Sequence, residues 1–437
     1  MLTTLKNAFK IKEVRNKILY TFLMLVVIRV GSQIPVPGVD RNYFANWFAQ
    51  QTGGAFSFFD AITGGSFLNM SILALGINPY ITSSISMQLL TIAIPKLEEM
   101  QKEGEDGKKK IASITRYVTV GLALLQAGFM AIGFGRQGLL VDYNAINVIT
   151  AIVAFTAGSA FLMWIGERIT EKGVGNGISV VLVINILARF PQDITGLFQQ
   201  FVIGKPFATA ALAAVIIVLI IILMVVMVII LNGGVRKIPV QYANKVQGRK
   251  MVGGSTSNIP LKVNTSGVIP VIFASSIMQL PIIICSFIGT SGTGIWAEIL
   301  KGLNSDNWCD LDAPIYSIGL LVYILLVVFF AYFYTSISFN PNLIADNMKR
   351  QGGFIPGIRP GKPTSEYLTK VLNYIIFIGA VGLLIIAVLP FVFNGFFNAS
   401  ISFGGTSLII IVSVILETIK QIESQMLVRN YKGFLND

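Results

Sequence analysis

The residue types that usually carry enzyme chemistry are scarce in this chain, and those present lack useful spacing. Its 437 residues include no histidine and only two cysteines, Cys285 and Cys309. The missing histidines remove the commonest general base and metal ligand, and two distant cysteines do not form a metal-ligand motif. The two thiols either pair on an oxidising side of a membrane or remain unrelated. We therefore expect no cofactor, no metal site and no enzymatic activity.

Two glycine-containing stretches look like phosphate-binding loops but lack the context that such loops need. GVGNGIS, at residues 173–179, looks like part of a dinucleotide fingerprint. No strand precedes it, and no βαβ unit fits there. GIRPGKPT, at residues 357–364, is one residue short of a phosphate loop and places Pro363 at the Ser/Thr position. Neither stretch predicts nucleotide binding, so energy for any transport must come from a partner.

The apolar segments instead offer rows of aliphatic side chains at helical spacing. Ile81 and Ile85 are four residues apart, and so are Leu182 and Ile186, so each pair shares one helix face. Such pairs usually serve packing or face lipid, but apolar rings can also close an aqueous pore by dewetting.

Polar side chains accompany these rows and favour an interior role for two segments. Ser83 and Gln88 follow Ile81, while Ser275 and Ser276 lie in a later apolar run. Polar side chains within a membrane span normally face other helices or a cavity. The two segments are therefore expected to face a path or a neighbouring helix.

The composition predicts an all-α polytopic membrane protein. Hydrophobic residues make up 54% of the chain and charged residues 12%, against about 25% charged in average globular proteins, and the mean hydropathy is +0.73. Apolar runs of spanning length predict ten transmembrane helices, at about residues 18–34, 76–94, 114–134, 147–166, 177–190, 209–231, 266–288, 314–335, 371–391 and 404–422.

The distribution of positive charge predicts the orientation of these spans. Of the 33 Lys and Arg residues, 27 fall on the side that holds both termini, so that side is expected to be cytoplasmic. Arg29 lies within the first span, and snorkelling to the outer interface is one way to accommodate it. The five at the outer side are Arg41, Arg136, Arg189, Lys205 and Lys301.

The stretch at residues 58–90 cannot be one uninterrupted span. Gly64, Gly65, Gly76 and Pro79 divide it, and the apolar piece before the second break is about half a span long. Irregular backbone at membrane depth survives only inside protein or beside a watery cavity, and short interrupted segments indicate a transport path. A helix resting on the outer surface is the alternative interpretation.

Three polar regions lie on the expected cytoplasmic side. Residues 1–17 alternate basic and apolar side chains and predict an amphipathic helix on the membrane face. The loops at 232–265 and 336–370 are basic and carry apolar residues and Gly/Pro turns, so we expect ordered projections. They serve either for topology alone or to dock an acidic partner such as ribosomal RNA.

Two other functions remain to be weighed against a channel. A secondary solute transporter with a broken-helix site normally needs ionisable groups at midplane depth, and Arg29 is the one clear charge within the first nine spans. An intramembrane enzyme lacks histidine, metal ligands and a suitable Ser or Asp pair.

Several motifs together resemble the SecY family, the channel-forming subunits of the bacterial Sec protein translocon, over essentially the whole chain. They are IPVPGVD (34–40), LGINPYITSSISMQLL (75–90), GERITEKGVGNGIS (166–179), RKIPVQYA (236–243), LKVNTSGVIPVIFASSI (261–277), GGFIPGIRPGKPT (352–364) and FGGTSLII (403–410).

The resemblance implies a fold of two inverted five-helix halves, at about 18–200 and 201–422, with a cytoplasmic tail at 423–437. An hourglass pore would run between the halves and open sideways to lipid between spans 2 and 7. The family's pore ring would correspond to Ile81, Ile85, Leu182, Ile186, Ile272 and Ile410. Ser83, Gln88, Ser275 and Ser276 would lie at the lateral gate. Its plug would be Ala61, Ile62, Thr63, Gly64, Gly65, Ser66, Phe67, Leu68, Asn69, Met70, Ser71 and Ile72.

The resemblance also implies partners. Arg359, with Arg249 and Lys250 at the tip of the other loop, would contact the SecA motor ATPase and ribosomes. SecE- and SecG-like small membrane subunits, signal peptides, unfolded secretory chains and membrane lipids complete the expected set. The implied function is a passive protein-conducting channel in a bacterial cytoplasmic membrane.

Overall fold

Helices dominate the architecture, and each expected span coincides with one of them. The computed structural model describes residues 8–40, 43–44, 60, 62–242, 245–247, 250–252, 256–288, 295–309, 314–397 and 405–433. The helices at the expected spans are α2 (Lys12–Gly31), α5 (Asn78–Ala93), α7 (Glu105–Phe134), α8 (Ala145–Lys172), α9 (Gly177–Phe201), α10 (Phe207–Gly233), α11 (Ile269–Ile288), α13 (Ile318–Ser338), α15 (Lys362–Phe397) and α16 (Gly405–Gly433).

Six helical stretches of the described chain are long and apolar enough to cross a membrane by length and composition. They are residues 105–134, 145–172, 177–201, 210–233, 314–350 and 362–393. Among the other helices, α5 has 16 residues, and the first turns of α2 carry Lys12, Glu13, Arg15 and Lys17. The chain is therefore a multi-pass membrane protein.

Several helices extend beyond the expected spans, among them α7, α15 and α16, and the differences at α9 and α2 concern residues discussed above. Helix α9 does not end near residue 190 but continues through Pro191 to Phe201. A proline removes one backbone donor, and membrane helices tolerate this where neighbouring groups satisfy the freed carbonyl. Helix α2 begins at Lys12, so the basic stretch expected as a separate helix at 1–17 partly belongs to the first span.

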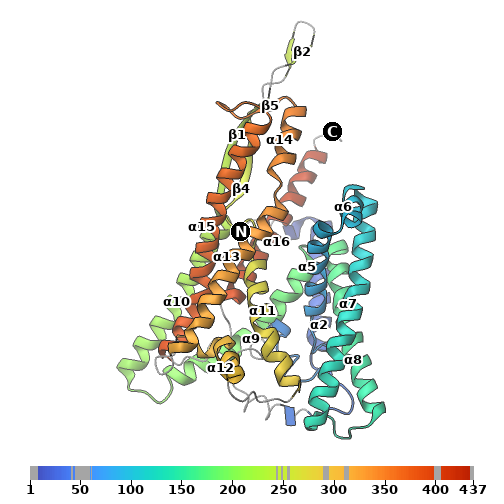
Figure 1. Ribbon diagram of the computed structural model, residues 1–437, viewed down its shortest axis with the longest axis vertical. Coiled ribbons are helices and arrows are strands. Elements are labelled where there is room, and N and C mark those ends of the chain that lie inside the picture. The colour runs from blue at the N-terminus through green and yellow to red at the C-terminus, as the bar shows by residue number, and fades with distance from the viewer. Residues whose placement is uncertain are drawn as a thin grey trace.

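The helices form two groups joined at the centre (Figure 1). Helices α2, α5, α7 and α8 contact one another on one side, and α10, α11, α13 and α15 do so on the other. Helix α9 packs against α8 and α16, while α16 packs against α10 and α15. Helices α9 and α16 therefore connect the groups, and α11 also touches α7.

Residues near the two ends of the chain pack together at one end of the molecule. Ala8 and Val14, from the start of the chain, share an apolar cluster with Val174 and Ile422. The Lys17 Nζ donates to Gln425 Oε1 at 3.4 Å. The start of α2 and the end of α16 therefore lie on the side of the α8–α9 connection.

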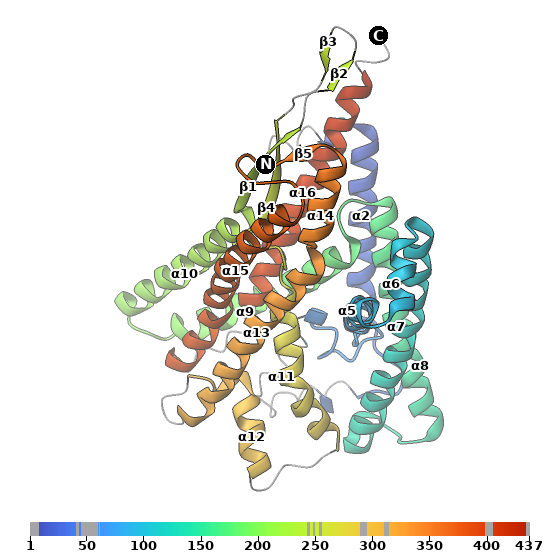
Figure 2. The ribbon, with the colours of Figure 1, turned by 45° about the horizontal axis from the view of Figure 1, so that its top comes forward.

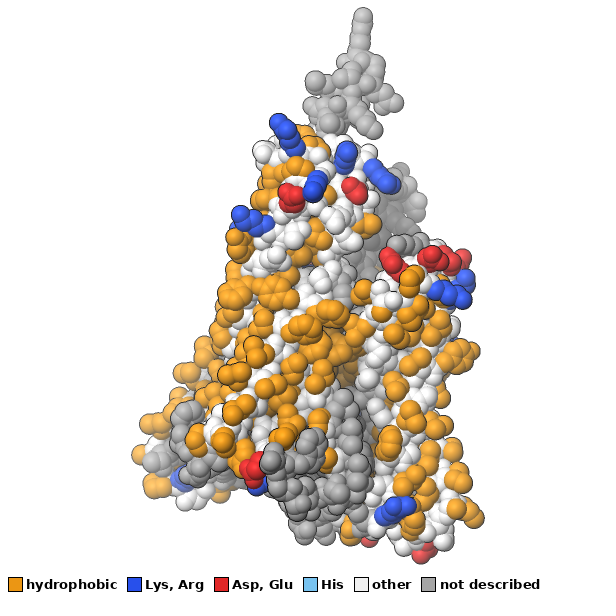
Figure 3. Space-filling model, viewed as in Figure 1, with side chains coloured by type: hydrophobic (Ala, Val, Ile, Leu, Met, Phe, Trp, Pro, Cys, Tyr) orange, Lys and Arg blue, Asp and Glu red, His pale blue; other side chains and the backbone are white. Residues whose placement is uncertain are grey.

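The described parts of the two long basic loops contain strands and a helix that project from the molecule (Figure 2). In the first, β1 (Val235–Tyr242) pairs antiparallel with β4 (Thr256–Lys262), with Ile238 opposite Ile259. The second contains α14 (Pro341–Arg350) and β5 (Gly353–Phe354), which adds to the free edge of β1. Beyond the sheet, β2 (Lys245–Gln247) pairs with β3 (Lys250–Val252). Lys and Arg side chains gather near this end, and hydrophobic side chains cover the flank below (Figure 3).

The glycine-rich stretch at 173–179 is a tight connection between α8 and α9. A Cβ on Gly177 would lie 1.9 Å from the carbonyl oxygen of Gly166. Gly175 adopts a φ of +86°, which glycine reaches without steric cost. The glycines thus permit close helix packing, which accounts for a motif that resembled a phosphate loop.

We predict that Gly158→Ala destabilises the protein, because helix α8 passes directly over the segment before α5. A Cβ on Gly158 would lie 1.9 Å from the carbonyl oxygen of Ile72. Overpacking of this kind costs about 1–3 kcal/mol, which thermal unfolding in detergent would detect.

Gly128→Ala in α7 is the matched control, because no atom lies within 4 Å of the added methyl group. This control should leave stability unchanged or slightly raised. Equal melting temperatures for the two variants would contradict the packing described here.

Candidate functional site

Aliphatic side chains from four helices of both groups meet where α9 and α16 cross the centre. Leu182 and Ile186 of α9 and Ile410 of α16 are buried in one apolar cluster. Ile81 of α5 and Ile272 of α11 are partly buried against it. Five of the six side chains expected in the ring therefore lie in one cluster.

Ile85 is the ring candidate that stands apart. Its side chain is buried, at 8% exposure, but it does not belong to the cluster that holds the other five. It lies one helical turn beyond Ile81 on α5. Of the two ring candidates on α5, only Ile81 therefore packs against the central cluster.

The segment before α5 is built from successive turns. Residues 62–63 are helical, and turns or an isolated bridge follow until α5 begins at Asn78. Gly64, Gly65 and Gly76 adopt positive φ, as does Met70 at +45°. We call residues 60–72 the plug segment; Ala61, within the expected plug, lies outside the described residues.

Backbone pairing fixes the end of the plug segment. Ser71 forms an antiparallel bridge with Pro35. The Val36 amide donates to the Met70 carbonyl at 3.1 Å, and the Ile72 amide donates to the Ile34 carbonyl at 3.0 Å. The IPVPGVD stretch thereby supplies backbone partners to a segment that forms no regular helix.

Apolar packing adds to this pairing. Phe67 and Met70 belong to a buried cluster with side chains of α7 and α8. Phe44 lies edge-on to both Phe67 and Phe134, with ring centroids 5.3 and 5.4 Å apart. Ile62 instead joins the cluster of the ring residues. The plug segment therefore packs against α7 and α8 through Phe67 and Met70, and against the central aliphatic cluster through Ile62.

Charged side chains also contact the plug segment. Arg29 of α2 donates from Nη2 to Asn185 Oδ1 at 2.7 Å and from Nη1 to the Gly64 carbonyl at 3.4 Å. Both terminal nitrogens of the Arg29 guanidinium therefore have interior partners, whereas its buried Nε has none. Asp60 is completely buried and forms an ion pair with Arg189 of α9.

The residues expected at the lateral gate differ in environment. Ser83 is buried, and its hydroxyl donates to the Thr115 carbonyl at 2.9 Å. Ser275 is buried as well, whereas Gln88 and Ser276 are exposed. Ser83 thus holds α5 to α7, while Gln88 and Ser276 leave polar groups on the surfaces of α5 and α11.

Of the basic residues expected to dock partners, Arg359 is fully described. Its side chain is exposed, and its carbonyl accepts from the Thr364 hydroxyl at 2.9 Å. Gly357 and Gly361, which flank it, adopt positive φ. A tight turn therefore presents Arg359 to solvent. Arg249 lies outside the described residues, and Lys250 is described only as the first residue of β3.

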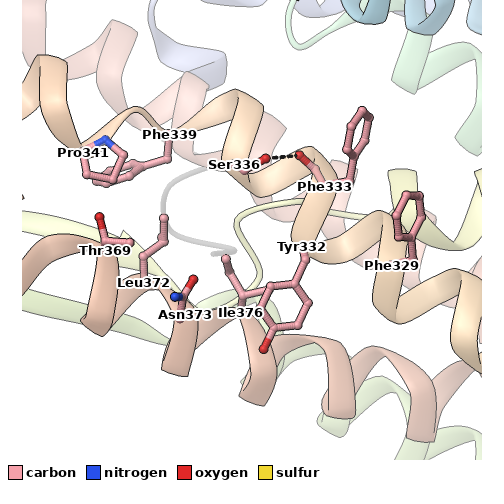
Figure 4. Close-up of a pocket in the computed structure, with 10 residues that line it drawn as sticks. All are labelled: Phe329, Tyr332, Phe333, Ser336, Phe339, Pro341, Thr369, Leu372, Asn373 and Ile376. Carbon is pink, nitrogen blue, oxygen red and sulfur yellow. Dashed lines mark hydrogen bonds between the residues drawn. The ribbon is translucent and has the colours of Figure 1, made fainter. Parts of the chain in front are cut away.

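A separate pocket lies between α13 and α15 and has a volume of about 550 Å³ (Figure 4). Its lining is mostly aromatic and aliphatic, with the Ser336 hydroxyl bonded to the Phe333 carbonyl at 2.7 Å. None of the ring residues lines it.

Within the described chain, no three His, Cys, Asp or Glu side chains could hold a metal ion. Cys285 and Cys309 do not form a disulfide with each other.

Comparison with known proteins decides the family. The sequence pattern of the SecY family matches residues 71–419. The chain belongs to the SecY family. Among curated members, "Protein translocase subunit SecY" from Streptomyces galbus is 44% identical over 450 residues and covers 100% of both chains. The subunit of the same name from Halalkalibacterium halodurans is 42% identical over 442 residues, with 100% of both covered.

Solved structures show the same fold. "The structure of a protein conducting channel" aligns over 94% of this chain and 92% of its own, with a TM-score of 0.61 and 16% identity. "Sec61 in the Canine ribosome-channel complex from the endoplasmic reticulum" aligns with a TM-score of 0.59, at 16% identity and the same coverage. The all-α polytopic architecture expected from the sequence is confirmed as that of SecY and Sec61 channels.

Sequence analysis did not connect Asp60, Asn185 and Arg189 with the plug. Two signals were available in the sequence. Asp60 directly precedes the expected plug, and Arg189 and Asp193 are four residues apart, a spacing that places them on one helix face. The contacts with the plug segment, however, depend on tertiary structure.

Proposed function

We propose that the chain forms the protein-conducting channel of a bacterial protein translocase, in which the aliphatic cluster is the pore ring. Unfolded polypeptides would cross through this ring, and apolar segments would leave sideways into lipid. The main support is the convergence of Ile81, Leu182, Ile186, Ile272 and Ile410 from both helix groups. The relatives are named as protein translocase subunits.

An aliphatic ring suits a channel that must accept many sequences. Its side chains offer no hydrogen bonds or charges, so they can surround a passing chain without binding any sequence tightly. Flexible, nonspecific surfaces favour promiscuous recognition in the same way. When the ring is empty, its apolar surface excludes water and opposes ion flow.

The plug segment would supply a second barrier at the ring. Ile62 packs into the ring cluster, while Phe67 and Met70 pack into the wall of α7 and α8. A related solved structure is described with the words "The plug domain of the SecY protein stablizes the closed state of the translocation channel and maintains a membrane seal". Displacement of the segment would leave the ring as the remaining seal.

Lateral opening would separate α5 from α11, which carry Ser83, Gln88, Ser275 and Ser276. Opening of this kind is a two-state change biased by the ligand that prefers the open form. An inserted apolar segment would be that ligand, since only the open form exposes it to lipid.

The exposed basic loops would dock partners on the cytoplasmic side, where both ends of the chain would also lie. Arg359 stands on a tight turn that presents its guanidinium to solvent, and ribosomal RNA and acidic protein faces both attract such groups. We propose the SecA motor ATPase and the ribosome as partners there, with SecE- and SecG-like subunits in the membrane. The related solved structures include Sec61 in a ribosome-channel complex and the yeast Ssh1 complex bound to a ribosome.

The alternative of a secondary solute transporter has less support. The charges that such a site would use are engaged with other residues: Arg29 contacts Asn185 and Gly64, and Arg189 pairs with Asp60. Saturable uptake of a small solute coupled to an ion gradient would favour this alternative.

A photoreactive residue at Ile186 should crosslink to a secretory chain stalled in transit through membrane vesicles. Ile186 is 2% exposed within the ring cluster, so a chain in the pore must pass against it. The same probe at Ile222 of α10, which is 57% exposed on an apolar helix, should give no adduct.

Probes at Ile85 and Ile272 extend this experiment along the pore. Ile272 should behave as Ile186 does, whereas Ile85, outside the cluster, should give a weaker adduct. Vesicles that translocate without any adduct at these three positions would overturn the pore assignment.

Deletion of residues 61–72 should raise the resting ion conductance while polypeptide translocation persists. The deletion removes the packing of Ile62, Phe67 and Met70 but leaves the ring residues in place. Conductance in planar bilayers measures the leak, with the unaltered chain as control. A conductance equal to that of the unaltered chain would refute the role of the plug segment.

Arg359→Glu should reduce motor-driven translocation at least about tenfold, because charge reversal at a docking contact adds repulsion to the loss of attraction. The side chain is exposed, so the amount of folded protein should not change. Translocation of a secretory precursor into vesicles measures the effect. Lys109→Glu, at the exposed start of α7 and outside the two basic loops, is the control for charge reversal, and equal activity of the two variants would remove Arg359 from the docking site.

A further inference from the structure

The function described so far does not explain the buried charges beside the plug segment. Asp60 has no exposed surface, although an isolated buried carboxylate is very costly. Its two oxygens have different partners. Oδ1 accepts from the Leu68 amide at 2.8 Å, while Oδ2 contacts Nη1 of Arg189 on α9. Asp60 therefore links the interior of the plug segment to a neighbouring helix.

Arg189 occupies the same face of α9 as the ring residues. Leu182, Ile186, Arg189 and Asp193 follow one another at spacings of four, three and four residues, which align side chains along one helix stripe. Arg189 Nε lies 3.8 Å from Asp193 Oδ1. The helix that supplies two ring residues therefore also supplies the cation that meets the plug segment.

A second cation reaches the plug segment from α2. Arg29 donates to Asn185 Oδ1 on α9 at 2.7 Å and to the Gly64 carbonyl at 3.4 Å. The absence of a side chain at Gly64 makes this approach possible, because a Cβ there would lie 2.6 Å from the Asn185 carbonyl oxygen. Arg29 thus joins α2, α9 and the plug segment at one point.

We propose that Arg29 and Arg189 are positioning residues that latch the plug segment to α9 in the closed channel, an inference that rests on the proposed function. The latch consists of the Asp60–Arg189 ion pair and the Arg29–Asn185–Gly64 contacts. Removal of one partner of a buried pair leaves an uncompensated charge. The plug segment therefore cannot leave while α9 stays in place without separating these charges.

The placement of the latch couples it to the ring. Movement of α9 away from α2 would carry Leu182 and Ile186 outward and would pull Asn185 from Arg29. The same movement would draw Arg189 from Asp60. Widening of the ring and release of the plug segment are thus one event, and neither cation needs to touch the translocating chain.

The test is the resting ion conductance of the complete translocase in planar bilayers. Arg189→Met keeps the aliphatic stem and removes the charge, and Asp60→Asn keeps an acceptor for the Leu68 amide. Each substitution should raise the resting conductance at least about tenfold. The loss of one buried contact is enough to shift the equilibrium between the closed and the open channel by this factor. Arg189→Lys should restore most of the seal.

The double variant distinguishes the loss of one specific ion pair from a general destabilisation of the closed channel. Because the two residues act on each other, Asp60→Asn with Arg189→Met should leak no more than the worse single variant. If the two single increases in conductance multiply in the double variant, Asp60 and Arg189 do not act as a pair, and the latch is overturned. Arg136→Met, which removes an exposed arginine, should leave conductance unchanged.

A labelling experiment follows the plug segment directly if Arg189→Met yields too little folded protein. With Cys285 and Cys309 replaced by Ser, Leu68→Cys should react faster with a membrane-impermeant maleimide in the Asp60→Asn background. An unchanged rate together with unchanged conductance would overturn the latch.

Translocation by the unaltered chain in the same preparation tests the proposed function separately. If the unaltered chain translocates and the latch variants do not leak, the latch alone fails. If the unaltered chain does not translocate a secretory precursor, the proposed function fails, whatever the conductance shows.

Discussion

The need to satisfy every backbone polar group at membrane depth governs this structure. Helices meet that need internally, but the plug segment cannot, because its glycines and turns interrupt helical bonding. Its amides and carbonyls instead find partners in the stretch at 34–36, in its own turns and in side chains of α2. The IPVPGVD motif and Arg29 are best understood as parts of this solution. A segment satisfied by contacts with separate elements can also be released, whereas a continuous helix cannot.

Helix α9 takes part in three features of the structure: the tight α8–α9 connection, the central aliphatic cluster and the contact with the plug segment. Its beginning depends on the glycines of the α8–α9 connection, where only a hydrogen fits against the Gly166 carbonyl. Its middle presents Leu182 and Ile186 to the central cluster, and its next turn presents Arg189. Because α9 also packs against α16, it lies between the two helix groups. A substitution on α9 is therefore expected to affect several properties at once.

The sequence was sufficient to predict the membrane spans, because each must be long and apolar whatever it packs against. Hydropathy located ten apolar segments, each of which coincides with a helix, and six helical stretches of the described chain meet the length and composition of a span. The resemblance identified five side chains that do converge. The predicted end of α9 was wrong, because the apolar run ends near residue 190 while the helix continues through Pro191 into a more polar turn as far as Phe201. The strands of the two basic loops were not predicted, since β5 joins β1 from more than a hundred residues away.

The polar contacts of the plug segment could not be predicted for a related reason. The partners of Arg29 lie 35 and 156 residues away, and no local pattern carries that information. Considered alone, an arginine in an apolar helix suggests an interfacial position, and the partner residues suggest nothing. The sequence shows that a charged residue lies in an apolar segment, which is costly in free energy. Only the tertiary structure shows which residues offset that cost.

The bridge between Ser71 and Pro35 has a consequence for how the channel closes. Only residues 72–77 separate Ser71 from the start of α5, so a displaced plug segment remains covalently attached close to its seat. Its return is therefore an intramolecular reaction, with an effective concentration in the millimolar range for short connections. Closure of this kind requires no partner and does not slow when channels are sparse in the membrane. If the plug segment acts as proposed, each channel would therefore reseal independently of its neighbours after a polypeptide has passed.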